Sequence, residues 1–254
     1  MNALRRVLHA PWLWLVLAAI QLLVAAALAV PLRAVVRVAM GPFTTDGEPQ
    51  ILGALLELVR VHPAVVATLV TSLAASAAIG LLLSPLLAGA VIVRLAGPAP
   101  VGEQARAALT HFPAALVIGI YGLVLRGLLA LIAAALGTLH PTLEILALVA
   151  SLTLCALAVD LARSRVVLEG ARGLHPRTFV RAVVGATQPI LWLRSGLLTV
   201  AQWGVSLAIL LAAVHGIGTP WSPWLVRALA VLATFVALWR VAVAVDTVSV
   251  RPRA

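Results

Sequence analysis

The sequence contains no lysine, one cysteine and few charges of either sign. Without lysine the chain cannot form the phosphate-binding loop GxxxxGK[ST]. The single Cys155 excludes a disulfide framework and a zinc site built from paired cysteines. Charged residues make up 10% of the chain and hydrophobic residues 63%. A soluble domain has about 25% charged and about 45–50% hydrophobic residues. Because so few charges cannot cover a water-facing surface, we expect an integral membrane protein.

Recognisable catalytic chemistry is also missing. The six histidines are scattered, without an HExxH motif or a Cys/His spacing that suits a metal. The chain has no GxSxG motif, and its eight acidic residues are too few and too far apart for an obvious acid–base pair. We therefore predict a protein that is not an enzyme and needs no metal or cofactor, although a membrane enzyme assembled from isolated residues remains an alternative.

Six apolar stretches are long enough to cross a bilayer, since a spanning helix needs about 20 predominantly apolar residues. They cover residues 12–30, 64–93, 114–136, 143–162, 191–214 and 224–245. We predict an all-α, polytopic bundle of six transmembrane helices that forms a single domain over residues 1–254. A long outer loop is expected at 31–63 and a long cytoplasmic loop at 163–190.

The positive charge is confined to one side of this arrangement. All 18 basic residues are arginine, and four alternate segments (the N-terminus, the loops after the second and fourth stretches and the C-terminus) carry +9 of the net +10. The positive-inside rule then places both termini in the cytoplasm, as an even number of spans requires. We expect a bacterial inner-membrane protein whose arginines face lipid headgroups, with no nucleic-acid partner.

The N-terminal stretch has a second interpretation. Arg5 and Arg6, an apolar run and then Ala27, Leu28 and Ala29 resemble a secretory signal with a cleavage site. The run is about 18 residues long, whereas signal peptides have apolar cores of about 7–15. Cleavage would leave five spans, so we favour an uncleaved anchor.

Three short basic stretches precede the odd-numbered spans, at residues 4–11, 105–113 and 180–189. Each combines arginine with small and apolar residues and ends in a proline, which the first turn of a helix tolerates well. We predict a short amphipathic elbow helix in the cytoplasmic interface at each stretch. A threefold repeat of elbow, outgoing helix and returning helix would follow, although any basic loop that ends in proline looks similar.

A polar cluster is predicted at the middle of the membrane. Counted from the preceding prolines, Gln21 falls at position +10 and Arg126 and Gln202 at +13, so the three share a helical face. Gly119 and Gly122 lie on the face of the arginine, where they would let another helix approach. A charge at this depth is costly and normally faces the bundle interior or a water-filled cavity. We interpret the arginine as structural, bonded to the glutamines or to backbone carbonyls. The alternative is a polar chamber that attracts an anion or an acidic headgroup.

Small residues recur every fourth position along the second span. A small-xxx-small stripe of this kind is typical of close helix packing in membranes. We predict a helix-packing face formed by Ser72, Ser76, Gly80, Ser84 and Ala88. This span exceeds the thickness of a bilayer and contains Pro85, so it should tilt, kink or project beyond the membrane.

The outer loop contains one amphipathic segment, residues 49–62, in which apolar side chains share one helical face. We expect a helix there that lies on the outer surface. Interfacial packing is the simpler role for this helix, and a lid is the alternative.

The cytoplasmic loop carries candidate docking residues, Arg172, Arg177 and Arg181. The segment 171–173, Ala-Arg-Gly, resembles the motif in the coupling helices of energy-coupling transporter subunits that dock on ATPases. Those proteins usually carry two such motifs and this chain has one. A cytoplasmic ATPase is therefore one candidate partner.

The whole chain resembles a broad group of bacterial six-helix inner-membrane proteins, similar to the membrane domain fused to some glycerophosphoryl diester phosphodiesterases. The resemblance lies in the Asp-led stretch 160–169, the elbow that ends at Pro189, the segment 30–33 and the small pair 88–89. It implies a helical membrane protein. It supplies no catalytic residues, because the chain has no counterpart of the soluble phosphodiesterase domain.

These observations lead to three hypotheses. The first is a non-enzymatic scaffold or assembly component that packs against a membrane partner through the small-residue stripe. The alternative is a transmembrane transporter subunit, with or without an ATPase, for a lipid-like or anionic solute that passes Arg126. A membrane enzyme that acts on lipid is the third. Membrane lipids are partners in every case.

Overall fold

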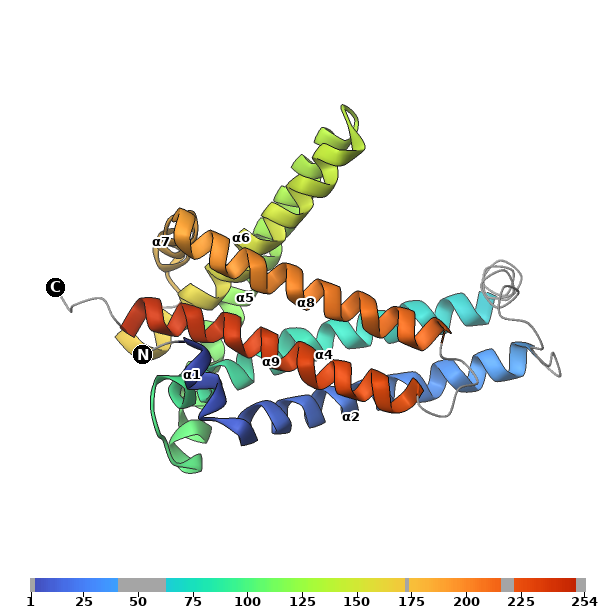
Figure 1. The fold of residues 1–254 in the computed structure, drawn as a ribbon, viewed down its shortest axis with the longest axis horizontal. Coiled ribbons are helices and arrows are strands. Elements are labelled where there is room, and N and C mark those ends of the chain that lie inside the picture. The colour runs from blue at the N-terminus through green and yellow to red at the C-terminus, as the bar shows by residue number, and fades with distance from the viewer. Residues whose placement is uncertain (1–2, 41–62, 172–173, 216–221, 250–254) are drawn as a thin grey trace.

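The described chain is helical, and it contains no strand in residues 3–40, 63–171, 174–215 and 222–249 of the computed structural model. Figure 1 shows its helices, which agree with the predicted all-α class. In chain order they are α1 (Ala3–Leu8), α2 (Pro11–Met40), α4 (Pro63–Ala96), α5 (Val101–Gly137), α6 (Pro141–Glu169), α7 (Pro176–Ala186), α8 (Pro189–His215) and α9 (Ser222–Ser249).

Four described stretches are long and apolar enough to cross a membrane. They are Ala78–Ala96, Val101–Gly137, Pro141–Glu169 and Trp224–Ser249, and the shorter segment Pro11–Ala27 is also apolar. About 20 residues of helix cover the hydrocarbon core of a bilayer. The chain is therefore a multi-pass helical membrane protein.

Several helices extend beyond their predicted spans, among them α2 and α6. α2 continues through Pro31 to Met40. The prediction of a loop that begins at residue 31 is therefore wrong for residues 31–40. α6 continues past residue 162 to Glu169 and ends at Gly170, whose positive φ of 67° forms a left-handed cap. Hydropathy marks where a helix leaves lipid, whereas the helix itself continues until a capping residue ends it. The helix expected at 49–62 lies outside the described residues.

Two of the three predicted elbows are separate helices, α1 and α7. Each ends just before the proline that begins a long helix, Pro11 or Pro189. The third elbow is not separate, because α5 begins at Val101 and runs unbroken through Pro113. An internal proline removes one backbone hydrogen bond without requiring a break in the helix. The elbow unit therefore occurs twice in the described chain, and the third stretch is an extension of its span.

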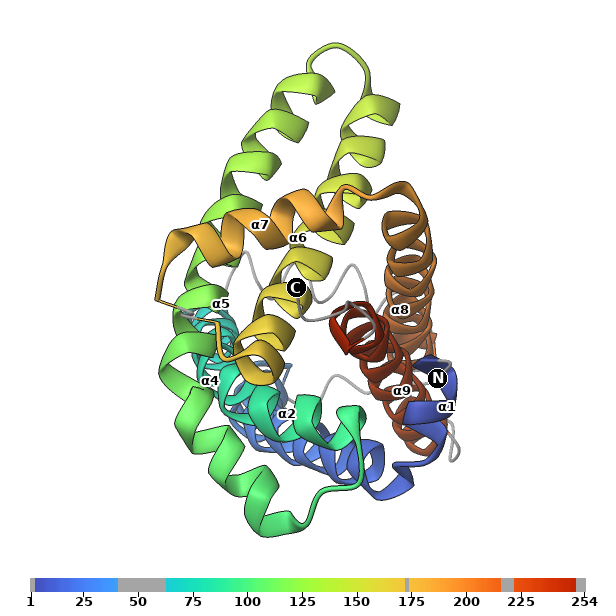
Figure 2. The ribbon, with the colours of Figure 1, turned by 90° about the vertical axis from the view of Figure 1, so that its left-hand side faces the viewer.

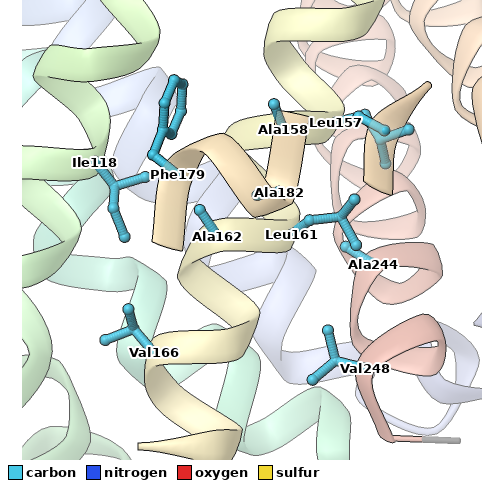
Figure 3. Packing of buried hydrophobic residues seen from close by; sticks show 11 residues of the cluster. Ile118, Leu157, Ala158, Leu161, Ala162, Val166, Phe179, Ala182, Ala244 and Val248 are labelled. Carbon is cyan, nitrogen blue, oxygen red and sulfur yellow. The ribbon is translucent and has the colours of Figure 1, made fainter. Parts of the chain in front are cut away.

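Buried apolar side chains gather at the end of the bundle that carries α1 and α7. α7 lies across this end, as Figure 2 shows. One cluster joins α5, α6, α7 and α9, with Ile118, Leu157, Leu161, Phe179 and Val248 among its members (Figure 3). A second joins α1, α4 and α9 through Val7, Ile92, Leu95, Leu238 and Val245. Close packing therefore fixes the helices where both elbows lie.

The same end is also fastened by Arg6 of α1. Its guanidinium pairs with Asp246 of α9, donates from Nη1 to the carbonyl oxygens of Leu95 and Ala96 at 2.9 Å each, and reaches Ser249 Oγ at 3.2 Å. The two carbonyls belong to the last turn of α4, where backbone acceptors lack helical partners. Arg6 thus holds the beginning of the chain to the ends of two long helices.

The other end is more open. In Figure 1 the far parts of α5 and α6 (green to yellow) form a hairpin that diverges from the other long helices. The large apolar side chains on this hairpin are exposed, among them Leu128, Leu131, Ile132, Ile145 and Leu146. Its turn is closed by His140, whose side chain accepts a hydrogen bond from the Thr142 backbone N–H. Within a bilayer these exposed surfaces would contact lipid.

Candidate functional site

A cavity of about 530 Å³ lies among the long helices. α2, α4, α5, α6, α8 and α9 all contribute to its wall. Its size falls within the range of about 300–1,000 Å³ that is usual for ligand sites. The wall combines large apolar side chains with four charged ones, Arg126, Asp160, Arg163 and Arg240.

The three residues of the predicted midplane cluster, Gln21, Arg126 and Gln202, all line this cavity. They do not bond to one another. Gln21 Oε1 accepts from the Thr234 hydroxyl at 2.8 Å, and Gln202 Oε1 accepts from Arg240 Nη1 at 3.0 Å. Arg126 is exposed and makes no hydrogen bond or ion pair with the described residues. The bonds that would make it a structural fastener are therefore not seen.

Asp160, Arg163 and Arg240 complete the charged wall. Asp160 Oδ2 accepts from Arg240 Nε at 2.9 Å. Arg163 donates from Nη1 to Ser84 Oγ at 3.0 Å, and its buried Nε has no partner among the described residues. Asp160 precedes Arg163 by three residues on α6, so the two side chains share a helical face. The three charged groups therefore lie within electrostatic reach of one another.

None of these three residues is among the predicted site residues, because the sequence places Asp160 and Arg240 at the cytoplasmic ends of their spans and Arg163 in the loop 163–190. The available signal was the helix register. Asp160 and Arg163 are three residues apart on the face that also carries Cys155 and Val159 toward the cavity. Since no glycine ends α6 before Gly170, an unbroken helix predicts this shared face better than hydropathy does.

Two glycines bring α5 against α6 beside Arg126. A Cβ on Gly122 would collide with the Cγ2 atom of Val159, and a Cβ on Gly119 would lie 3.2 Å from Arg163 Nη2. The prediction that these glycines let another helix approach on the face of Arg126 is confirmed. This close approach places Arg126 and Arg163 on the wall of one cavity.

Along the small-residue stripe of α4, Gly80 and Ser84 are exposed, whereas Ala88 packs against the second apolar cluster. Gly80, Ser84 and Ala88 line the cavity, and no atom lies within 4 Å of a Cβ built on Gly80. The tight contact of α4 falls instead at Gly89, where an added Cβ would collide with the backbone of Ala107 in α5. Small side chains here leave space for the cavity. Ser72 is partly exposed, and the side chain of Ser76 lies outside the described residues.

The cavity wall carries a net charge of +2, because three arginines face one aspartate. A guanidinium has five N–H donors and no acceptor. The three side chains together make only three hydrogen bonds with the described residues, so most of their donors are free. Because Asp160 is held by Arg240, the wall offers positive charge and hydrogen-bond donors rather than an acid–base pair. In the described part of the chain no three His, Cys, Asp or Glu residues gather to hold a metal.

The predicted docking residues lie apart from the cavity. Arg177 and Arg181 are exposed on α7, whose opposite face buries Phe179 and Ala182. Arg172 lies outside the described residues. An ATPase that docks on α7 stays a prediction.

In comparisons with known proteins, no family model, curated protein or solved structure matches the chain. The resemblance to the membrane domains fused to phosphodiesterases therefore stays a prediction. The basis for a functional proposal is the arginine-lined cavity itself.

Proposed function

We propose that the chain crosses the bacterial inner membrane six times with both termini in the cytoplasm. Figure 1 supports part of this topology, because α2, α4, α8 and α9 run alternately between the two ends of the molecule, whereas the far parts of α5 and α6 diverge from them as a hairpin. α1 and the end of α9 lie at one end, joined by the pair Arg6–Asp246. Exposed tryptophans near the helix ends, Trp12, Trp192 and Trp224, fit a position at the two membrane surfaces. The arginine surplus supports the orientation.

Cysteine labelling tests this topology. In a Cys155→Ser background, His140→Cys should react with a membrane-impermeant maleimide on intact spheroplasts, since the α5–α6 turn faces outward in the proposal. Arg177→Cys on α7 should react only after lysis. Both positions are exposed. The opposite pattern of labelling would contradict the proposed orientation.

We further propose that the protein binds an anionic solute or the acidic headgroup of a lipid inside the bundle and transports it. The observation that carries this proposal is the cavity wall with three arginines and one aspartate. Uncompensated charge among membrane helices is unfavourable, and an anion would offset it while occupying the free donors. Transporters commonly bind their substrates between helices near the middle of the membrane.

This proposal takes precedence over the scaffold hypothesis for a specific reason. In the scaffold hypothesis a membrane partner packs on the small-residue stripe, whereas in the structure Gly80, Ser84 and Ala88 of that stripe line the cavity. A subunit that transports an anion uses the same residues as the wall of its binding site.

Co-purification tests the binding step. The full chain would be extracted with its surrounding bilayer by a nanodisc-forming polymer from a bacterial host, and retained molecules would be identified by mass spectrometry. Wild type and Arg177→Gln, a change on the exposed surface of α7, should retain an anionic molecule in stoichiometric amount. Arg126→Gln should lose most of it. Equal retention by all three proteins, or no retained anion in the wild type, would overturn the proposal.

A further inference from the structure

We infer that the cavity binds a phosphate monoester carried by a lipid. This inference rests on the proposed function and names the chemistry of its ligand. Three features of the wall support it: the net charge, the free hydrogen-bond donors and the apolar surface beside them.

The net charge selects a dianion. With Arg126, Arg163 and Arg240 facing Asp160, the wall carries +2. A phosphate monoester carries about −1.5 to −2 at pH 7, so it comes close to neutralising the wall. A carboxylate or a phosphate diester carries a single charge and would leave about +1 without a partner. Because the field of a charge is poorly screened away from water, this remainder favours the monoester.

The free donors match the oxygens of a monoester. Arg126 makes no bond with the described residues, and Arg163 uses Nη1 for Ser84, which leaves its Nη2 without a partner among the described contacts. Arg240 uses Nε and Nη1 for Asp160 and Gln202, which leaves its Nη2 free among the described contacts. A monoester presents three strong acceptor oxygens. Guanidinium groups bind phosphate through paired N–H donors, so the free donors of this wall suit a phosphate group.

The apolar surface indicates a lipid as the carrier of the phosphate. Leu123 and Trp203 line the same cavity, and they are 58% and 54% exposed. Leu17, Leu152 and Leu238 complete an apolar surface next to the arginines. A free phosphate ion would leave this surface uncovered, whereas the acyl chain of a lipid would cover it.

Defined ligands test the inference on the purified full chain in detergent. Native mass spectrometry would compare phosphatidic acid (a monoester), phosphatidylglycerol (a diester) and phosphatidylcholine with matched acyl chains. We expect phosphatidic acid to bind at least about tenfold more tightly than phosphatidylglycerol, because one additional charged hydrogen bond contributes about 1.5 kcal/mol or more. Inorganic phosphate and glycerol 3-phosphate should displace phosphatidic acid only at much higher concentrations.

Matched variants assign the binding to the cavity. Arg126→Gln should weaken the binding of phosphatidic acid about tenfold or more, and Arg177→Gln on the exposed face of α7 should leave it unchanged. Equal loss in both variants would indicate surface charge and overturn the assignment. Thermal unfolding of each variant without lipid shows whether its fold is intact.

The outcomes separate this inference from the proposed function. If phosphatidylglycerol binds as tightly as phosphatidic acid and both depend on Arg126, the preference for a monoester is wrong while anion binding stands. If neither binds better than phosphatidylcholine, both proposals fail. If glycerol 3-phosphate competes at equal concentration, the monoester chemistry holds but a lipid carrier is wrong.

Discussion

Two arginine–aspartate pairs hold this molecule together, one at the end of the bundle and one in the cavity. The side chains of Arg6 and Asp246 are 10% and 19% exposed, and those of Arg240 and Asp160 are 17% and 9% exposed. Burial is therefore similar, but the surroundings differ. Around Arg6 all three guanidinium nitrogens donate to protein acceptors. Around Arg240 two further arginines share the cavity wall with a single carboxylate.

The difference distinguishes a structural arginine from one that is available to a ligand. Arg6 neutralises Asp246 and completes the last turn of α4, so it offers little to an additional molecule. Arg126 lines an open cavity without a partner among the described residues. By burial alone the two pairs would look alike. The number of unused N–H donors around each pair distinguishes them.

Asp160→Asn should have the largest effect on stability. The change removes the only carboxylate of the cavity wall while it preserves the shape of the side chain, so three arginines are left without compensation. Removing one partner of a buried pair costs about 3 kcal/mol. The free energy of unfolding, measured by thermal denaturation in detergent, should fall by about this amount. A loss below about 0.5 kcal/mol would mean that the pair in the cavity contributes little to stability. The comparison between the two arginine–aspartate pairs would then fail.

Arg6→Gln should destabilise the protein by about 2 kcal/mol, because hydrogen bonds to a charged group contribute about 1.5–3 kcal/mol. Binding of phosphatidic acid to the folded protein should not change, because Arg6 does not line the cavity. Arg5→Gln is the matched control, since the neighbouring Arg5 is exposed. Loss of lipid binding without loss of stability in Arg6→Gln would reverse the roles of the two regions.

Gly122→Ala should cost about 1 kcal/mol, because the added methyl group overpacks the contact with Val159 where α5 meets α6. Gly80→Ala is the control. It adds the same methyl group where no atom lies within 4 Å, so it should be neutral or stabilise the protein by up to about 1 kcal/mol, because alanine is the better helix former. Thermal denaturation of both variants measures the difference. Equal effects would show that the approach of α5 to α6 is looser than the structure indicates.

The sequence predicted the helical class and the shared location of Gln21, Arg126 and Gln202, because both depend on local patterns that the fold preserves. It also predicted that Gly119 and Gly122 admit a second helix. These properties follow from composition and from the spacing of residues along single helices.

The remaining part of the site depends on contacts between helices, which one-dimensional patterns do not determine. The sequence places Asp160 at the cytoplasmic end of the span 143–162 and Arg163 in the loop after it, because hydropathy falls there, although α6 continues as far as Glu169. Arg240 reaches Asp160 from a helix that is 80 residues away in sequence. The stripe on α4 was predicted to pack against a helix, but its small side chains can equally leave a space. Only the arrangement of neighbouring helices decides between these outcomes.

Arg126→Leu should have the smallest effect on stability of these variants, and it tests the central claim most directly. The melting temperature of the variant would be measured in detergent with and without phosphatidic acid, beside wild type. The account predicts an unchanged or higher melting temperature without lipid, because an unpaired charge is removed, and loss of the stabilisation that the lipid gives to wild type. A lower melting temperature without lipid, with the stabilisation by lipid retained, would show that Arg126 is structural and would contradict the account.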